Sequence, residues 1–216
     1  MMAATLLPAT GQPPGGSDVD ANRLEVLRRL ADEGLRHAGE GLSEMTGSPI
    51  STAVPRVDRL PIAQIAQLDA GPDEVVAGIY LAIGGDVAGH MLLLLPLRDA
   101  MEMTDMLLEQ PPGTTVELDD LACSALGEVG NLTCSFFLTS LADATGMRLY
   151  PSPPATVIDM GGAILDSLLA DISVEADEAL AVETIFTQND RKVNLLFLVL
   201  LRPHYLEIVL GHLPQC

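Results

Sequence analysis

Residues 117–145 carry polar side chains at the spacing of one helical face. Ser124, Glu128 and Asn131 follow one another at steps of four and three residues. They belong to a longitudinal row of six polar residues, the polar file, which spans an arc of about 80° on an ideal helix: Glu117, Asp120, Ser124, Glu128, Asn131 and Ser135. Ser124 has no His or Lys base within a helical turn, so an activated-serine mechanism lacks its partner. Glu128 and Asn131 instead place a carboxylate and a carboxamide one helical turn apart.

The element expected to position these groups is one long helix over residues 117–145. Its apolar residues recur at steps of mostly three and four: Leu118, Leu121, Ala125, Val129, Leu132, Phe136 and Leu141. Asn is a poor helix former, and an interior glycine costs about 1 kcal/mol relative to Ala. Gly127 and Gly130 beside the polar file therefore indicate a close backbone approach. Two interpretations are open: the small residues let another molecule's backbone approach, or the polar file is an ordinary solvated face and a helix–helix contact explains the glycines.

Composition excludes several classes of function. The chain has 216 residues, 11 Lys and Arg against 30 Asp and Glu, and a formal charge of −19, which excludes phosphate-backbone binding and disfavours anionic membranes. Cys123, Cys134 and Cys216 are too few for a disulfide framework or a zinc site, and the four His residues are dispersed. No secretory signal is recognisable, and the longest apolar run, residues 195–201, is too short to span a bilayer. We expect a cytoplasmic protein.

The order of predicted elements repeats once. Residues 1–20 are rich in Pro, Gly and small residues and predict a disordered tail, with a single domain over 21–216. Each half then has a long helix, an extended piece, a hairpin and a closing helix, in half-repeats of about 21–110 and 114–213. In the first half the long helix is predicted at 21–46, the extended piece at 49–57, the hairpin at 75–83 and 87–95, and the closing helix at 97–109. In the second half the long helix is predicted at 117–145, the extended piece at 147–158, the hairpin strands within 174–187 and at 191–201, and the closing helix at 203–213, with an extra short helix at 161–170. Residues 60–68 read equally as a strand or a short helix. Two such units predict a pseudo-twofold α/β (α+β) domain with a central antiparallel sheet flanked by two long helices.

The polar file also resembles a known family signature. Ser124-x3-Glu128-x2-Asn131, followed after 22 residues by Pro154, resembles the pattern of the CheC/CheX/FliY family: Asp or Ser, then Glu, then Asn, then a distant Pro. These proteins are phosphatases that act on the phosphorylated form of CheY, the response regulator of chemotaxis. The resemblance extends to the duplicated layout over residues 22–213, and it implies the CheC-like fold.

The resemblance also implies roles for the four residues. Asn131 would be catalytic, entering the active site of a CheY-like receiver domain and orienting the water that attacks its aspartyl phosphate; Glu128 would reach the receiver's lysine. Ser124 and Pro154 would support the site. Mg²⁺ would come from the receiver, so the chain would need no cofactor and no metal site of its own. A CheD-like deamidase is a further partner that the family implies. Because the duplication completes the sheet within one chain, we expect a monomer.

The first half lacks the signature. Counting back from Pro55 places Asp32, Arg29 and Glu25 at the Asn, Glu and Ser positions, and no Glu-x-x-Asn occurs in residues 1–110. A duplicated fold with one functional site is therefore expected. Two alternatives remain: a non-catalytic CheC-like adaptor or flagellar-switch component that binds a receiver domain, and an acidic α/β domain of unrelated function.

Overall fold

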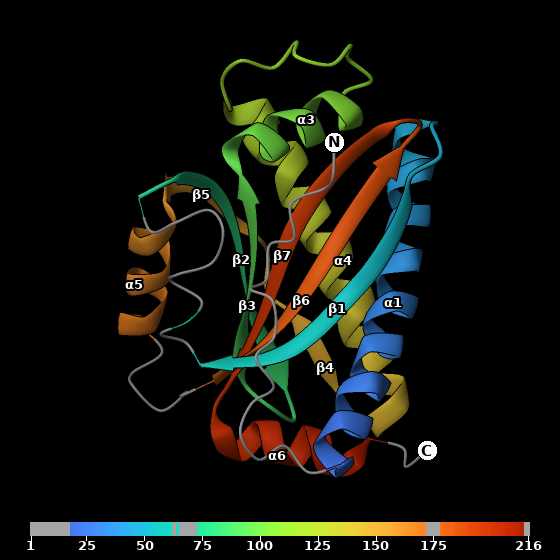
Figure 1. The fold of residues 1–216 in the computed structure, drawn as a ribbon, viewed down its shortest axis with the longest axis vertical. Helices are drawn as coiled ribbons and strands as arrows, with labels where there is room; N and C mark the ends of the chain where they lie inside the picture. Colours follow the sequence, from blue (N-terminus) through green and yellow to red (C-terminus); the bar gives the residue numbers. More distant parts are fainter. Residues whose placement is uncertain (1–17, 62–63, 65–72, 172–177, 214–216) are drawn as a thin grey trace.

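Seven strands form one antiparallel sheet in a computed structural model that describes residues 18–61, 64, 73–171 and 178–213 (Figure 1). The elements in chain order are α1 (Asp18–Thr46), β1 (Ser51–Pro61), β2 (Val75–Gly85), β3 (Gly89–Pro96), α3 (Leu97–Leu107), α4 (Asp120–Thr145), β4 (Leu149–Pro151), β5 (Ala155–Met160), α5 (Gly161–Asp171), β6 (Glu178–Gln188), β7 (Arg191–Leu201) and α6 (Pro203–His212). Of the predicted tail, residues 1–17 lie outside the described part, and α1 begins at Asp18, three residues before the predicted domain boundary.

The strand order interleaves the two halves of the chain. It runs β1-β6-β7-β3-β2-β4, and β5 also pairs with β2. The hairpin of the first half, β2–β3, therefore receives β4 and β5 from the second half, and the hairpin β6–β7 receives β1 from the first. The hairpins meet at β3 and β7 in the middle of the sheet. This exchange gives the predicted pseudo-twofold arrangement, with its axis between β3 and β7.

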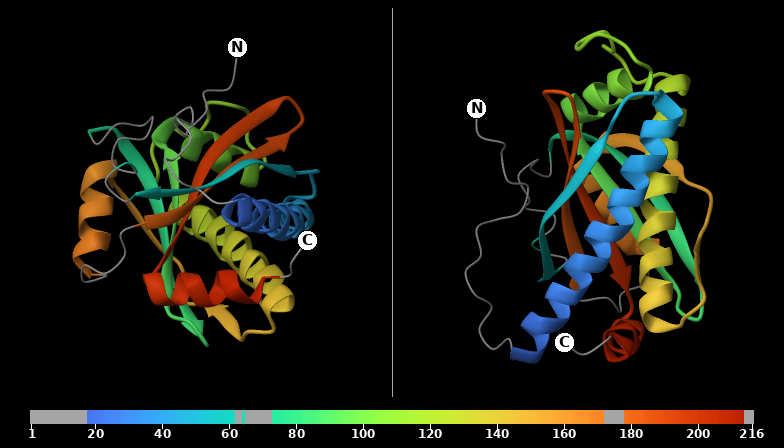
Figure 2. Two further views of the ribbon diagram at one scale, coloured as in Figure 1. Left: turned by 60° about the horizontal axis from the view of Figure 1, so that its bottom comes forward. Right: turned by 90° about the vertical axis from the view of Figure 1, so that its right-hand side faces the viewer.

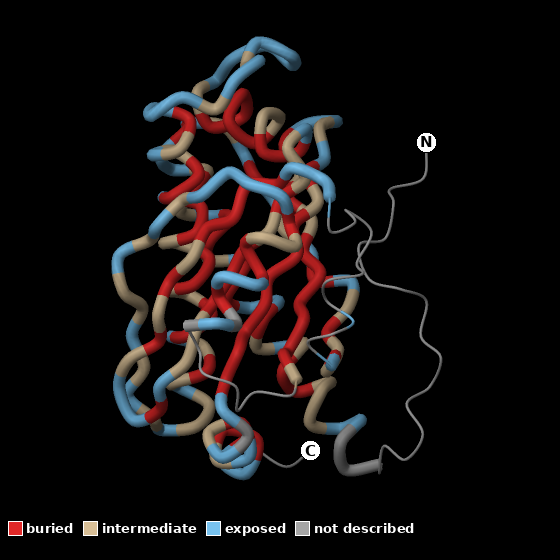
Figure 3. The backbone as a smooth tube through the Cα atoms, turned by 90° about the vertical axis from the view of Figure 1, so that its left-hand side faces the viewer, coloured by how far each residue is buried: buried red, intermediate tan, exposed pale blue. Residues whose placement is uncertain are grey.

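The two long helices lie side by side on one face of the sheet (Figures 1 and 2). Most of the core lies between these helices and the sheet, and it includes Leu35, Phe137, Ile79 and Phe197. On the opposite face, α5 covers part of the sheet with Ile164 and its neighbours. α3 and α6 close the two ends of the molecule (Figure 1), and the central strands are buried along most of their length (Figure 3).

The sequence predicted most of the elements and missed some of their bounds. Both hairpins, the extended pieces and helices α3, α5 and α6 are confirmed. Gly47 and Gly146 end the two long helices with positive φ angles of 68° and 72°, as glycine allows. Of the ambiguous residues 60–68, Leu60 and Pro61 belong to β1, whereas all the others except residue 64 lie outside the described residues, as do 174–177.

One helix, α4, is long and apolar enough to span a membrane by length and composition alone. Half of its most apolar window is buried in the structure, because α4 packs against both the sheet and the neighbouring helix α1. Its apolar character is therefore that of a core helix.

Candidate functional site

The site residues are carried by α4, whose two ends are both fixed. Asp119 is the N-cap, and its side chain accepts a hydrogen bond of 2.9 Å from the backbone N–H of Ala122. At the other end, the N–H of Gly146 donates to the carbonyl of Ala142. The cap places the start of the helix at Asp120, so the prediction that Glu117 belongs to the helical file is wrong.

The glycines of α4 face the sheet. A β-carbon at Gly130 would lie 2.4 Å from Cγ2 of Ile79 on β2, which is closer than any side chain tolerates. A β-carbon at Gly127 would lie 3.7 Å from Pro154 Cγ and from Thr156 Oγ1, so only a methyl group fits there. Both glycines are buried. Neither sequence explanation of the glycines was right: Gly130 makes room for side chains of β2 and Gly127 lies against Pro154 and Thr156, with no bound molecule or second helix involved.

The polar file lies on the outer side of α4, away from Gly130 and next to Gly127. Ser124 and Glu128 are exposed, and Asn131 and Ser135 are half-buried. Asn131 follows Glu128 by three positions, which corresponds to a rise of about 4.5 Å and an angular offset of about 60° around the helix. Within the described residues neither side chain has a hydrogen-bond or ion-pair partner. A carboxylate and a carboxamide are thus presented side by side to an incoming molecule.

Pro154 borders this file from the neighbouring strand segment. Its position beside Gly127 places it one residue from Glu128 on the side of α4 that faces β5. The segment is held by Ser152, whose Oγ accepts from the N–H of Ala82 at 2.9 Å and whose own N–H donates to the Ala82 carbonyl. Thr156 ties the same segment to α4 by donating to the carbonyl of Cys123 at 3.3 Å. The structure therefore brings together all four residues singled out in the sequence.

Comparison with known proteins shows which family this is. A model of the CheC-like family matches residues 121–158, the segment that holds α4 and Pro154. The CheY-P phosphatase CheC of Bacillus subtilis is 30% identical over 177 residues, which cover 81% of this chain and 85% of that protein. The chain belongs to the CheC-like family. A putative CheY-P phosphatase, CheC1 of Halobacterium salinarum, is 23% identical over 64% of this chain and 70% of its own length.

Solved structures share the fold of this CheC-like chain. FliY of Thermotoga maritima superposes with a TM-score of 0.73 at 17% identity, over 88% of this chain and 94% of FliY. The FliM middle domain of H. pylori gives a TM-score of 0.60 at 13% identity, over 88% of this chain and 98% of that domain. The predicted fold class is confirmed.

The first half of the CheC-like domain offers a direct counterpart to the file. Gly47 and Pro55 stand as far apart in sequence as Gly146 and Pro154, and at this alignment the same positions of α1 and α4 are buried: Leu27 and Leu126, Ala31 and Gly130, Leu35 and Cys134, Leu42 and Leu141. The alignment places Glu25 opposite Ser124 and Arg29 opposite Glu128. Glu25 is bound by Arg28 at 2.9 Å and by Arg29 at 3.2 Å, so the groups at the Ser124 and Glu128 positions are paired with each other.

The thiol next to the file is unsuited to nucleophilic chemistry. Burial raises the pKa of Cys123, and the nearby carboxylates of Asp120 and Asp119 raise it further, so the thiol stays protonated at neutral pH. Cys134 is fully buried and acts as an apolar core residue, as predicted, whereas Cys216 lies outside the described residues. In the described ranges no three His, Cys, Asp or Glu side chains are grouped as metal ligands.

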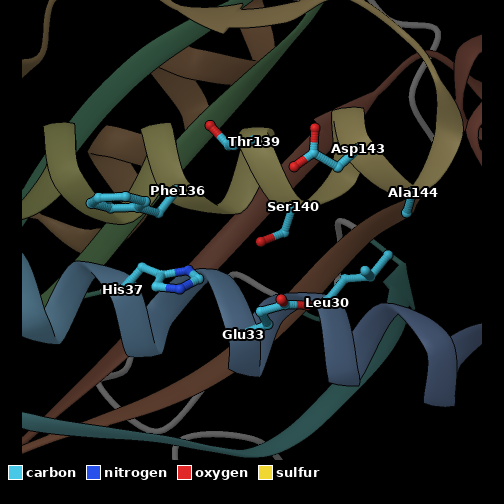
Figure 4. Close-up of a pocket in the computed structure, with 8 residues that line it drawn as sticks. All are labelled: Leu30, Glu33, His37, Phe136, Thr139, Ser140, Asp143 and Ala144. Carbon is cyan, nitrogen blue, oxygen red and sulfur yellow. The ribbon is translucent and has the colours of Figure 1, made fainter.

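A groove of about 320 Å³ lies between α1 and the second half of α4 (Figure 4). It is lined by Leu30, Glu33, His37, Phe136, Thr139, Ser140, Asp143 and Ala144. His37 packs against the ring of Phe136, with ring centroids 5.7 Å apart. In Figure 4 Ser140 points toward α1, whereas Thr139 and Asp143 point away from it. None of the four sequence candidates lines this groove, so it is separate from the polar file.

Sequence periodicity misplaced one residue at the edge of the site. Leu121 was assigned to the apolar stripe of α4, but its side chain is 60% exposed. The buried stripe is centred on other residues of the helix, including Leu126, Thr133 and Phe137. The predicted stripe instead marks a flank of α4, on which Ala125 and Leu132 are only partly buried.

Proposed function

We propose that the protein hydrolyses the aspartyl phosphate of a CheY-like receiver domain. The observation that carries the proposal is the unpartnered pair of Glu128 and Asn131 on the outer face of α4, bordered by Pro154, in a chain that matches a CheY-P phosphatase over four fifths of its length. An exposed helical ridge of this kind is suited to entering the active site of another protein.

The proposed role of Asn131 is to place a water molecule. Hydrolysis of an acyl phosphate needs water held in line with the phosphorus, and positioning of this kind removes several kcal/mol from a barrier. The carboxamide can accept a hydrogen bond from that water and donate one to a phosphoryl oxygen. Mg²⁺ in the receiver would neutralise the developing charge.

The proposed role of Glu128 is to dock the receiver. Its carboxylate is exposed and has no cationic neighbour among the described residues, so it is available to an ammonium group of the partner. Ser124 and Pro154 would border the contact on either side. The chain carries a formal charge of −19, so long-range attraction to an acidic receiver would be absent, and affinity would depend on these local contacts. Association with a CheD-like deamidase and the monomeric state stay predictions.

The test is the decay of acyl phosphate in a Mg²⁺-bound phospho-receiver from the same organism, with wild-type protein and the Asn131→Ala and Glu128→Ala variants. Wild type should accelerate decay, Asn131→Ala should abolish the acceleration while still binding the receiver, and Glu128→Ala should mainly weaken binding. Binding without acceleration by the wild type would instead identify a non-catalytic adaptor. Wild-type rates with Asn131→Ala would refute the assignment of that residue.

A further inference from the structure

Leu121 is an exposed apolar residue at one end of the polar file. It is 60% exposed, and no other large hydrophobic side chain of α4 is exposed. Leu121 precedes Glu128 by seven residues, which on a helix puts the two within about 20° of each other and about 10 Å apart along the axis. Leu121 therefore lies on the same face as the proposed docking residue, about two turns nearer the start of α4.

The packing of α4 does not account for Leu121. The apolar contact that commonly stabilises a helix start is made by the residue before the N-cap. Here that residue is Leu118, which is half-buried and packs against the core. Leu121 comes two residues after the cap and points to solvent. A single exposed leucine is ordinary on a protein surface, so its position relative to other groups decides whether it has a role.

A second apolar group lies on the other border of the file. Pro154 lies beside Gly127 and Thr156 bonds to Cys123, so β5 runs antiparallel to α4 here. Alternate residues of a strand share a face, and Ile158 therefore projects on the same side as Thr156, toward the first turn of α4. Ile158 is 38% exposed and Met160, next on that face, is 45% exposed.

From this arrangement we infer that Leu121, with Ile158 and Met160, forms the apolar part of the surface on which the receiver domain docks. The inference rests on the proposed function. A specific interface buries about 800 Å² on each partner, equivalent to a disc of about 16 Å radius. Leu121 lies about 15 Å from Asn131 along the helix axis. A receiver centred over Asn131 and Glu128 thus reaches Leu121, and it would exclude water from the apolar border of a polar contact.

The inference is tested by separating binding from turnover. The ligand is the CheY-like receiver of the same organism, loaded with Mg²⁺ and beryllofluoride for binding and phosphorylated for turnover. We expect Leu121→Ser to raise the dissociation constant about tenfold, the loss typical of an apolar interface contact, and to leave the turnover rate at saturating protein unchanged. Ile158→Thr should raise the dissociation constant about threefold. Leu121→Met retains the apolar surface and should bind as wild type.

The controls separate this inference from the proposed function. Val157→Ser removes an apolar residue of similar exposure from the opposite side of β5, near Ile164, and should leave binding unchanged. If Leu121→Ser binds the receiver as tightly as wild type while Asn131→Ala abolishes turnover, the docking role of Leu121 is wrong and the phosphatase stands. If wild type neither binds the receiver nor accelerates its dephosphorylation, the proposed function itself fails. Circular dichroism of each variant establishes that it is folded.

Discussion

The outer faces of α1 and α4 are built on the same backbone plan but carry different side chains, and they differ in whether the carboxylate on each face has a cationic partner. On α1, Glu25 is held by Arg28 and Arg29, and these arginines lower the pKa of Glu25 to about 2. On α4, Glu128 and Asn131 have no partner within the described residues. The duplicated fold supplies two equivalent positions, but only on α4 do a carboxylate and a carboxamide stand together without a partner among the described residues.

The strongest test of this comparison converts the α4 face toward that of α1. Asn131→Asp places on α4 the residue type that α1 has at Asp32. We expect the rate of receiver dephosphorylation to fall about 100-fold or more, which corresponds to about 2.7 kcal/mol in the barrier. The introduced carboxylate would repel the aspartyl phosphate and cannot donate a hydrogen bond. The decay of phospho-receiver measures this.

The reciprocal change on α1 is the matched control. Asp32→Asn should leave the rate unchanged, because Arg29 occupies the position of the docking carboxylate. If the Asn131→Ala, Asp32→Asn double variant dephosphorylated the receiver faster than Asn131→Ala alone, the α1 face would be able to support the reaction despite its ion pairs.

The second test concerns how closely each helix approaches the sheet. Gly130→Ala should destabilise the protein by about 2–3 kcal/mol, because its β-carbon would overlap Ile79. Ala31, the counterpart on α1, already carries a methyl group, so Ala31→Gly should cost only about 1 kcal/mol. Urea denaturation measures both. Gly127→Ala, which has room for the methyl group, should be neutral or slightly stabilising; equal stabilities of the Gly127 and Gly130 variants would contradict the close contact with β2.

A third test addresses the segment that leads into α4. Asp105 on α3 is buried and accepts hydrogen bonds from Thr114 N–H at 3.1 Å, and from Thr115 N–H at 2.7 Å and its hydroxyl at 2.6 Å. Burial acts to raise the pKa of Asp105, but the bonds from Thr115 and from the N–H groups of residues 113–114 outweigh it, so the pKa is lowered. We expect Asp105→Asn to cost about 2 kcal/mol at neutral pH, measured by urea denaturation.

The pH dependence gives the sign of this effect. A carboxyl group whose pKa is lower in the folded state stabilises the fold above its unfolded pKa, about 3.9, and loses that contribution as the pH falls through the folded value. The difference between wild type and Asp105→Asn should therefore shrink below about pH 4. A difference that stayed constant to pH 2 would mean that ionisation of Asp105 is irrelevant.

The smallest expected effect is on α1 itself. Arg28→Gln should raise the pKa of Glu25 from about 2 toward its ordinary value, and Arg29→Gln should do so less, because the Arg28 hydrogen bonds contribute most to the lowering. The unfolding midpoint should not change measurably, since exposed ion pairs contribute little to stability. NMR titration of the carboxyl group measures the pKa, and an ordinary value in wild type would show that the ion pairs do not persist in solution.

The sequence predicted the features that depend on local spacing. Helix periodicity placed Ser124, Glu128 and Asn131 on one face, and glycines marked both helix ends. Local spacing could not explain why residue 130 is a glycine, because the reason is a contact with Ile79, about 50 residues away on β2. It also assigned Leu121 to the core. A helix that packs against both a sheet and a second helix buries a broad arc, and the spacing of apolar residues then locates a flank instead of the centre.

The interleaved strand order has a consequence for how the chain folds. Among the described strands β1 pairs with β6 alone; the side chain of Ser51 and the carbonyl of Thr187, for example, are joined across 136 positions. Such distant pairings slow folding, because loop-closure entropy is lost before the contacts that repay it have formed. During synthesis, residues 18–107 would remain without a complete sheet until β6 and β7 leave the ribosome. We therefore expect all-or-none unfolding, and the first half expressed alone should not fold.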